Sequence, residues 1–239
     1  MKNKIALVTG SNKGIGYGLV SELANAGYEV WLAARNVDLG EKAAQKLGSH
    51  VHFIPLEVTS DESVATALKI FAGKRDRLDL LVNNAGIYLD GRDGAPSSTS
   101  IQVINEVFNV NFLGAIRVTQ AFLPLIRKST QGKILNVSSA LGSLNLTLDH
   151  SPAGVSSVNI LGYNSSKAAL NMFTALLSNE LKESGIMVNC ICPGHVATDL
   201  NGHSGKLTVE ESAKGIMDFI QRDAFITGHY IKKGGEHPW

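Results

Sequence analysis

Residues 5–16 read Ile-Ala-Leu-Val-Thr-Gly-Ser-Asn-Lys-Gly-Ile-Gly, a short apolar run followed by a turn that contains three glycines. The apolar run at 5–9 has the length and the aliphatic composition of a strand. After the turn, residues 14–27 have the pattern of a helix. Strand, turn and helix therefore follow one another directly, which predicts the first part of a β-α-β unit.

The rest of the chain repeats this alternation of short β-branched runs and longer helical patterns. Such alternation predicts a parallel sheet with helices on both faces. We therefore predict one α/β domain over residues 1–239, doubly wound, with a mainly parallel seven-stranded sheet. The further strands are predicted at 29–34, 51–56, 78–83, 134–137, 186–191 and 229–232, the last at the sheet edge, and the further helices at 36–47, 59–72, 103–128, 163–184 and 208–221.

Several predicted helix ends carry local signals. Asn36 can cap the helix that follows it, and Thr59 with Glu62 forms a possible capping box. Gly185 is expected to stop the helix before it. Pro124 is expected to bend the last turns of the longest helix.

Length and charge limit the classes of partner. A chain of 239 residues with 44% hydrophobic content can bury about 70–75% of its unfolded surface, enough for one sizeable core. The net charge of +1 gives no strong field to attract nucleic acid or anionic lipid. The start lacks the pattern of a secretion signal, and no stretch reaches the ~20 apolar residues that span a bilayer. We expect a cytoplasmic protein with a small-molecule partner, no nucleic acid and no membrane.

The two cysteines, Cys190 and Cys192, alternate along a predicted strand. Free cysteine is among the most buried residue types, so we interpret both as packing residues. His195 and His203 could add metal ligands, but the spacing of the four side chains matches no zinc pattern. We therefore expect no metal site.

The glycine turn suggests a ligand. Glycines between a strand and a helix let the backbone approach a pyrophosphate, and the helix N-terminus adds N–H groups and partial positive charge. The position predicts a dinucleotide site, although Leu19 stands where the last glycine of the G-x-G-x-x-G spacing would fall. The alternative is a tight turn that serves only close helix packing.

Tyr163 and Lys167 stand four residues apart at the start of a predicted helix. Residues with this spacing lie on one helix face, so both side chains can point into one cleft. A neighbouring cation favours the phenolate, which would bring the phenol pKa from about 10 toward neutral and make it a proton donor and acceptor. The alternative is a surface pair without function.

Further motifs lie along the chain. They are Thr-Gly-x-x-x-Gly-Ile-Gly at 9–16, Asn-Asn-Ala-Gly at 83–86, Asn111, Val-Ser-Ser at 137–139, Tyr163-x-x-x-Lys167 and Pro193-Gly194. In order and spacing, and over the whole chain, they resemble the short-chain dehydrogenase/reductase family. Within that family the chain is similar to the NADPH-dependent carbonyl reductases, partly through residues 198–205 and the Gly-Gly-Glu-His-Pro-Trp at 234–239.

The resemblance implies an oxidoreductase that transfers hydride from NADPH to the carbonyl of an aldehyde, ketone or quinone-like small molecule. It implies Tyr163 as the general acid that protonates the carbonyl oxygen, with Lys167 lowering its pKa and binding the nicotinamide ribose. It also implies that Ser139 holds the carbonyl oxygen and that Asn111 completes a water relay. The alternative for Asn111 is that it satisfies a kink in the long helix.

The end of the second strand favours NADPH over NADH. An NAD site typically has a carboxylate there that binds the ribose 2′-hydroxyl. This sequence has Ala34 and then Arg35, with Lys13 in the glycine turn. Two cations suit a 2′-phosphate; the alternative is that Arg35 is only a solvated charge. Glu57 stands where the family usually has an aspartate that holds the adenine, and we include it. The predicted cofactor contacts are Gly10, Ser11, Asn12, Lys13, Gly14, Ile15, Gly16, Arg35, Glu57, Val58, Asn83, Ala85, Gly86, Tyr163, Lys167, Pro193, Gly194, Val196 and Thr198, the last four being implied contacts of the nicotinamide or else part of an ordinary turn.

Residues 140–162 form a long connection between Ser139 and Tyr163 that is rich in leucine, valine and isoleucine. Long loops in compact domains are usually functional or disordered. We predict that this segment is a wall of the substrate pocket that selects bulky apolar carbonyl compounds. The alternative is that it covers a helix or a subunit interface, in a homo-oligomer that the sequence leaves open.

Two other functions stay open. A nucleotide-binding sensor of this fold would keep the glycine turn and lose the chemistry, but Asn111, Ser139, Tyr163 and Lys167 are all present. A nucleotide-sugar epimerase or dehydratase would use the same tyrosine and lysine. Those relatives usually carry a larger C-terminal substrate domain than the short stretch after Pro193. The sequence does not name the substrate.

Overall fold

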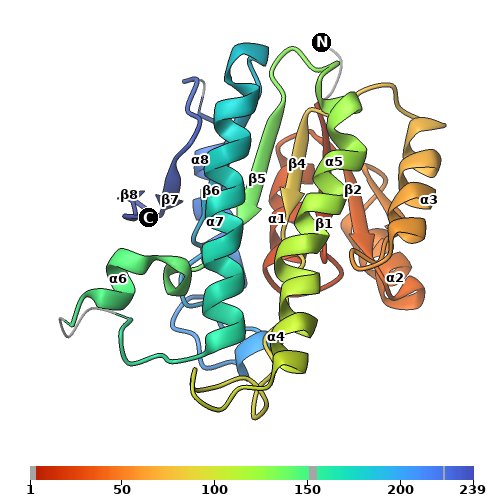
Figure 1. Ribbon diagram of the computed structural model, residues 1–239. Coiled ribbons are helices and arrows are strands. Elements are labelled where there is room, and N and C mark those ends of the chain that lie inside the picture. Colours follow the sequence, from red (N-terminus) through yellow and green to blue (C-terminus); the bar gives the residue numbers. More distant parts are fainter. Residues whose placement is uncertain (1–3, 151–154, 223) are drawn as a thin grey trace.

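The computed structural model describes residues 4–150, 155–222 and 224–239, and it is an α/β fold in which helices flank a central sheet (Figure 1). Within those residues the sheet has eight strands in the order β3-β2-β1-β4-β5-β6-β7-β8. Neighbouring strands from β3 to β7 are parallel. The strands are β1 (Ile5–Thr9), β2 (Glu29–Ala34), β3 (Val51–Pro55), β4 (Leu80–Asn83), β5 (Lys133–Val137), β6 (Met187–Ile191), β7 (Tyr230–Lys232) and β8 (Gly235–Glu236).

Helices cover both faces of the sheet. In Figure 1, α5 and α7 lie in front of the strands, whereas α1 and α8 lie behind them. Across the described ranges, no helix combines the length and the apolar character needed to cross a membrane. The helices are α1 (Gly14–Asn25), α2 (Val37–Leu47), α3 (Asp61–Ala72), α4 (Ile101–Phe108), α5 (Gly114–Ile126), α6 (Leu144–Leu148), α7 (Leu161–Leu181) and α8 (Val209–Ile220).

Strand β1 lies in the middle of the core and is buried on both faces. Ala6 and Val8 pack in one cluster with residues of α1 and α8, whereas Ile5 and Leu7 pack in the other with residues of α3, α5 and α7. Burial on both faces explains why the strand is a continuous apolar run. Because β2 and β4 flank β1, the glycine turn stands at the centre of the carboxyl edge of the sheet, where the strand order reverses.

The far edge of the sheet differs from the prediction. The strand predicted at 229–232 is found as β7, but it is not the edge, because the chain turns back at Gly234, whose φ is +78°. Strand β8 then pairs with β7 in antiparallel orientation. The predicted seven strands are therefore one too few. With two residues and no apolar side chain, β8 has no periodicity that would reveal it.

Helix caps were predicted correctly in two of three places. The side chain of Asn36 accepts a backbone N–H of the first turn of α2 at 2.9 Å. Gly185 ends the turn after α7 with a left-handed φ of 69°. The capping box of Thr59 and Glu62 is wrong, because the cap of α3 is Ser60, whose hydroxyl accepts a backbone N–H of the first turn at 3.1 Å.

The helix predicted at 103–128 consists of three segments. Helices α4 and α5 are joined by a π-helical turn, Asn109–Leu113, which contains the buried Asn111. Such turns are rare and occur frequently at functional sites. Pro124 lies inside α5, which ends two residues later at Ile126.

Residues 140–162 lie partly outside the described ranges, because 151–154 are not described. The segment begins with a 3-10 turn, Ala140–Gly142, and continues into α6. Leu144 and Leu148 of α6 are 70% and 73% exposed. Two of the three leucines of α6 therefore face outward, whereas Leu146 is half-buried.

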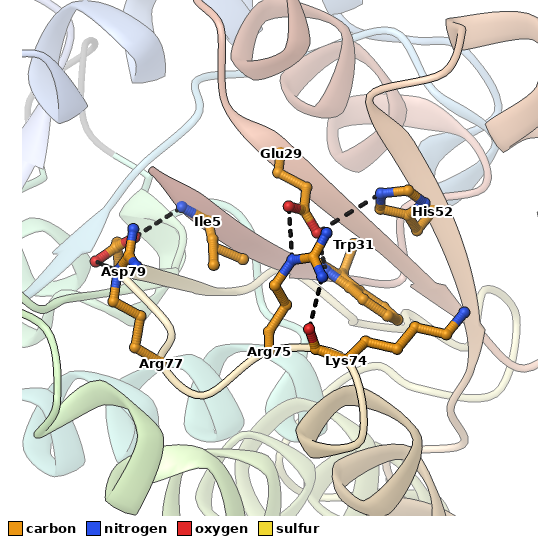
Figure 2. Close-up of polar contacts among 8 residues, drawn as sticks. All are labelled: Ile5, Glu29, Trp31, His52, Lys74, Arg75, Arg77 and Asp79. Carbon is orange, nitrogen blue, oxygen red and sulfur yellow. Dashed lines mark hydrogen bonds and ion pairs between the residues drawn. The ribbon is translucent and has the colours of Figure 1, made fainter. Parts of the chain in front are cut away.

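The amino ends of the strands carry a network of paired charges (Figure 2). Glu29, at the start of β2, accepts hydrogen bonds from Arg75 Nε at 2.7 Å and from Trp31 Nε1 at 3.1 Å. His52 Nε2 is 3.6 Å from the same carboxylate. Arg75 also donates to the carbonyl oxygen of Lys74 at 2.6 Å. This network ties β2 and β3 to the segment that follows α3.

A second carboxylate, that of Asp79, ties the start of β1 to two other segments. Asp79, directly before β4, accepts the backbone N–H of Ile5 at 2.8 Å and the hydroxyl of Ser129 at 2.6 Å. Arg77 Nε donates to it at 3.2 Å. The Asp79 side chain is only 11% exposed. It therefore joins three separate segments at the end of the sheet that is opposite the glycine turn.

Candidate functional site

A cavity of about 470 Å³ lies at the carboxyl ends of the parallel strands. Ligands bind at this edge of doubly wound sheets, and the volume is within the usual range for small-molecule and cofactor sites. Its walls come from the glycine turn, from the ends of β2, β4 and β5, from the start of α7 and from the segment after β6. Segments far apart in sequence therefore meet around one hollow.

Most of the predicted cofactor contacts line this cavity. Ser11, Gly16, Asn83, Gly194 and Val196 are not among the described lining residues. The predicted contacts that do line it are Gly10, Asn12, Lys13, Gly14, Ile15, Arg35, Glu57, Val58, Ala85, Gly86, Tyr163, Lys167, Pro193 and Thr198.

The glycine turn is built for close approach. Gly10 has a φ of +61°, and a Cβ there would stand 2.7 Å from the Cα of Ala85. A Cβ on Gly16 would stand 2.5 Å from Asn84 Nδ2. Both distances are shorter than side-chain contacts allow, so only glycine lets the turn pack against the segment after β4.

Two predicted contacts have structural partners instead of a place in the cavity wall. The hydroxyl of Ser11 donates to the carbonyl oxygen of Val8 at 2.7 Å and accepts the N–H of Ala33 at 3.2 Å, which joins β1 to β2. The amide of Asn83 donates to side chains of α5 and β5, each at 2.8 Å. Its neighbour Asn84 lines the cavity.

Several lining residues were missed by the sequence analysis. Asn84 belonged to the quoted Asn-Asn-Ala-Gly motif, so a signal for it existed. Tyr88 and His203 lie in irregular segments and Leu200 in a three-residue 3-10 turn, where no periodicity shows which side chains face inward. Asp199 also lines the cavity; it lies in the stretch 198–205 that the sequence analysis quoted for the resemblance but to which it gave no contact beyond Thr198.

Four charged side chains of the cavity form two solvent-accessible ion pairs. Lys13 Nζ lies 2.7 Å from the carboxylate of Asp199, and their side chains are 64% and 56% exposed. Lys13 lowers the pKa of Asp199 through this hydrogen bond. Arg35 is 73% exposed and 3.8 Å from the carboxylate of Glu57. Exposed pairs are weak, so an anionic ligand could compete for both cations.

Tyr163 and Lys167 line the cavity together, as their spacing predicted. Lys167 is buried, donates to the carbonyl oxygen of Val137 at 2.9 Å, and has its Nζ 5.6 Å from the centre of the Tyr163 ring. The side chain of Ser139 lies close enough to the phenol of Tyr163 to lower its pKa. The ends of β5 and the start of α7 thus bring a phenol, a hydroxyl and an ammonium to one place.

The expected lowering of the Tyr163 pKa is not found for the chain alone. Burial raises the pKa of Tyr163 to about 12, with the Ser139 side chain acting in the opposite direction. Burial also lowers the pKa of Lys167 to about 8. Desolvation disfavours the charged form of each group, and it is the largest cause of both shifts.

Asn111 holds a loop by both of its amide atoms. Its Oδ1 accepts the N–H of Ile87 at 2.8 Å, and its Nδ2 donates to the carbonyl oxygen of Ile87 and to the hydroxyl of Ser166, both at 3.0 Å. A Cβ on Gly86 would stand 3.5 Å from both Asn111 Oδ1 and Lys167 Nζ. The π-helical turn therefore brings Asn111 to the side of Lys167.

The C-terminal segment supports Ser139 from behind. The hydroxyl of Tyr230 donates to the carbonyl oxygen of Ser139, and the rings of His237 and Trp239 pack on Tyr230. Ser143 donates to the carbonyl oxygen of Pro238 at 2.7 Å. The start of the segment 140–162 therefore rests on the C-terminal tail. No described residue of this segment lines the cavity.

Both cysteines are buried, in agreement with a packing role. Cys190 and Cys192 form a small cluster with Tyr230, and burial raises the pKa of each thiol. Protonated thiols are poor metal ligands. In the ranges that the structure describes, no group of three or more His, Cys, Asp and Glu residues is arranged to hold a metal ion.

The chain has well-described relatives. It is 34% identical over 223 residues to the short-chain dehydrogenase anuI of Penicillium roqueforti. The alignment covers 89% of this chain and 86% of that protein. It is 29% identical over 280 residues to salutaridine reductase of Papaver bracteatum, covering 90% and 89%. The crystal structure of an NADPH-bound carbonyl reductase from chicken fatty liver has a TM-score of 0.86, 30% sequence identity and full coverage of both chains.

The family described as short chain dehydrogenase matches residues 4–207. That range contains the glycine turn, the Asn-Asn-Ala-Gly motif and the helix that carries Tyr163 and Lys167, which together surround the cavity. Likeness in sequence and likeness in fold thus agree with the motifs. The chain belongs to the short-chain dehydrogenase/reductase family of oxidoreductases.

Proposed function

We propose that this protein is a carbonyl reductase that uses NADPH to reduce an aldehyde, ketone or quinone-like small molecule, with Tyr163 as the general acid. The observation that carries the proposal is the contact of the Tyr163 phenol with the Ser139 side chain beside the buried Lys167. Two neighbouring hydroxyl donors suit a carbonyl oxygen that gains negative charge. The NADPH-bound carbonyl reductase of chicken supports the same assignment.

The cavity fits a dinucleotide. The left-handed Gly10 and Gly14 leave the backbone of the turn open at the N-terminus of α1, where a pyrophosphate is favoured. Gly86 keeps the space between Asn111 and Lys167 free of a side chain. When bound, NADPH supplies the hydride. The remaining chemistry, proton donation and orientation of the carbonyl group, belongs to residues of this chain.

The preference for the 2′-phosphate form rests on charge. Strand β2 ends at Ala34, and Arg35 lines the cavity where an NAD site wants a carboxylate. Lys13 lines it from the glycine turn. Each charge-assisted hydrogen bond to the phosphate would contribute about 1.5–3 kcal/mol. Asp199 and Glu57 are the groups with which the phosphate would compete.

The raised pKa of Tyr163 keeps the phenol protonated before the reductive step, and it also makes the phenol a weaker acid than one with a pKa near neutral. With a pKa of about 12, the phenol is protonated throughout the physiological range and has a proton to give. As the proton moves to the carbonyl oxygen, the Ser139 hydroxyl and the Lys167 ammonium stabilise the phenolate that forms. Asn111, next to Lys167, is where we expect the relay that returns a proton to Tyr163.

The test is turnover with a panel of carbonyl compounds. Purified protein is mixed with NADPH or NADH and with aldehydes, ketones and quinones, and the loss of reduced-nicotinamide absorbance is followed. We expect loss with NADPH and at least one class of carbonyl compound. NADPH binding without turnover on any compound would favour a nucleotide-binding sensor. Interconversion of nucleotide sugars without net loss of NADPH would favour an epimerase.

A further inference from the structure

The helix that carries Tyr163 is capped from a distant loop. Ile160, the residue before α7, has a side chain that cannot accept a hydrogen bond. The first three N–H groups are satisfied by the segment 93–94 instead. Leu161 donates to the carbonyl oxygen of Gly94 at 2.9 Å. Gly162 and Tyr163 donate to Oδ1 and Oδ2 of Asp93, each at 2.8 Å.

This arrangement differs from the other helix starts. Helices α2, α3, α4 and α8 are capped by Asn36, Ser60, Ser100 and Thr208, each directly before its own helix. The carboxylate of Asp93 comes from 69 residues before Gly162, and Asp93 is only 5% exposed. A negative charge at a helix N-terminus is favourable, and more so when it is shielded from water.

Gly162 is required for this contact. A Cβ at this position would stand 2.8 Å from Asp93 Oδ2, closer than real side chains approach. The glycine before the tyrosine therefore admits the carboxylate to the start of the helix. Because both oxygens of Asp93 are engaged, one by each N–H, the carboxylate fixes the height and the rotation of the first turn.

The same loop contacts the cavity. Its start is held by Asn111 through both backbone groups of Ile87. Tyr88, the next residue, lines the cavity and packs edge-on against the ring of Tyr163, with ring centres 6.2 Å apart. Asp93 holds the end of the loop. The loop thus touches Tyr163 twice, at its ring and at its backbone.

We propose that Asp93 is a positioning residue for Tyr163: its carboxylate sets the first turn of α7 so that the phenol meets Ser139 and the carbonyl oxygen of the substrate. The inference rests on the proposed function. Misplacement of a reacting group by about 1 Å can reduce the rate by about 10²-fold. Most of the predicted cofactor contacts lie outside α7, so loss of the Asp93 contact should affect proton donation much more than cofactor affinity.

The test compares Asp93→Asn with Ser100→Ala. Asparagine has the same shape, but its amide nitrogen would meet one of the two N–H groups. Ser100→Ala removes an ordinary cap from α4 in the same region and controls for the loss of any cap. For Asp93→Asn we expect kcat to fall by at least about 10-fold, NADPH Kd to stay within about 2-fold, and the solvent deuterium isotope effect on kcat to increase. Ser100→Ala should leave all three near wild type.

Gly162→Ala is the second variant and keeps the carboxylate. We expect it to lower kcat as Asp93→Asn does, because the methyl group displaces the Asp93 oxygen. Hydrogen exchange of the amides at 161–163 should become faster in both variants. These amide rates can be measured whatever the protein catalyses.

Two results would overturn the inference. One is a kcat of Asp93→Asn no lower than that of Ser100→Ala. The other is unchanged exchange at 161–163 in Asp93→Asn, which would mean that the carboxylate does not hold the turn. If the wild type reduces no carbonyl compound, the proposed function fails, and the exchange rates alone then decide whether Asp93 holds Tyr163.

Discussion

Charged side chains are largely buried at the amino end of the sheet and mostly exposed at the carboxyl end. At the amino end, Glu29 and Asp79 are largely buried, and each accepts hydrogen bonds from several segments (Figure 2). At the carboxyl end, Lys13 and Arg35 are mostly exposed and reach only one carboxylate each among the described contacts. Buried side chains with several hydrogen-bond partners hold segments together. Exposed ion pairs contribute little to stability, and their cations remain able to bind an anionic ligand. Substitutions at the two ends should therefore separate stability from function.

The largest effect is expected at the amino end. Asp79→Ala leaves the buried N–H of Ile5 without its acceptor and should reduce the free energy of unfolding by about 3–5 kcal/mol. Turnover per folded molecule should stay near wild type, because the site lies at the other end of the strands. Urea denaturation gives the free energy, and Asp218→Ala, an exposed aspartate of α8, is the control. Equal stability of the two variants would contradict the comparison.

Tyr163→Phe should show the reverse pattern. Only the proton donor is removed, so kcat should fall by at least about 10²-fold. NADPH affinity, measured by fluorescence titration, and the melting temperature should both remain close to wild type. Turnover near wild type would remove Tyr163 from the role of general acid.

Lys167 is the exception at the carboxyl end, because it is buried. Its pKa in the folded chain is about 8, against 10.5 for an ordinary lysine. Between these values the unfolded chain binds more protons, so the free energy of unfolding contributed by this group rises with pH, by up to about 3 kcal/mol. Urea denaturation at pH 7 to 10 should reveal a rise in wild type relative to Lys167→Met. A difference that does not change with pH would mean that the ammonium is not desolvated.

The smallest effect concerns the exposed cations. Arg35→Asp turns an attractive contact with a 2′-phosphate into a repulsive one and should weaken NADPH binding by about 10-fold or more. NADH, which lacks that phosphate, should bind about as before, and stability should hardly change. Equal NADPH affinity in titrations of wild type and variant would require the 2′-phosphate to bind elsewhere.

The sequence predicted best what depends on neighbouring residues. The bounds of β1 and β2 were correct because continuous apolar runs between glycine and polar turns identify buried strands. The shared face of Tyr163 and Lys167 followed from helix geometry alone. Thr59 and Ser60 are adjacent and both can cap a helix, so the choice between them needed the backbone.

What could not be predicted depends on distant segments. The raised pKa of Tyr163 comes from burial, which the spacing of Tyr163 and Lys167 does not contain. That Asn84, and not Asn83, lines the cavity depends on where β4 ends relative to β5. The cap of α7 joins Asp93 to Gly162 and Tyr163, which follow it in the sequence by 69 and 70 positions. A contact of that separation leaves no local sequence pattern.

That distant cap also bears on the order of synthesis. Asp93 is made before Gly162 and Tyr163, so the acceptor is present when the first turn of α7 leaves the ribosome. Closing a contact of this sequence separation is slow compared with forming a local helix turn. We expect the body of α7 to form early and its first turn to become ordered only after the loop has docked. A circular permutant that begins between the two segments would reverse that order and make the start of α7 wait for its cap.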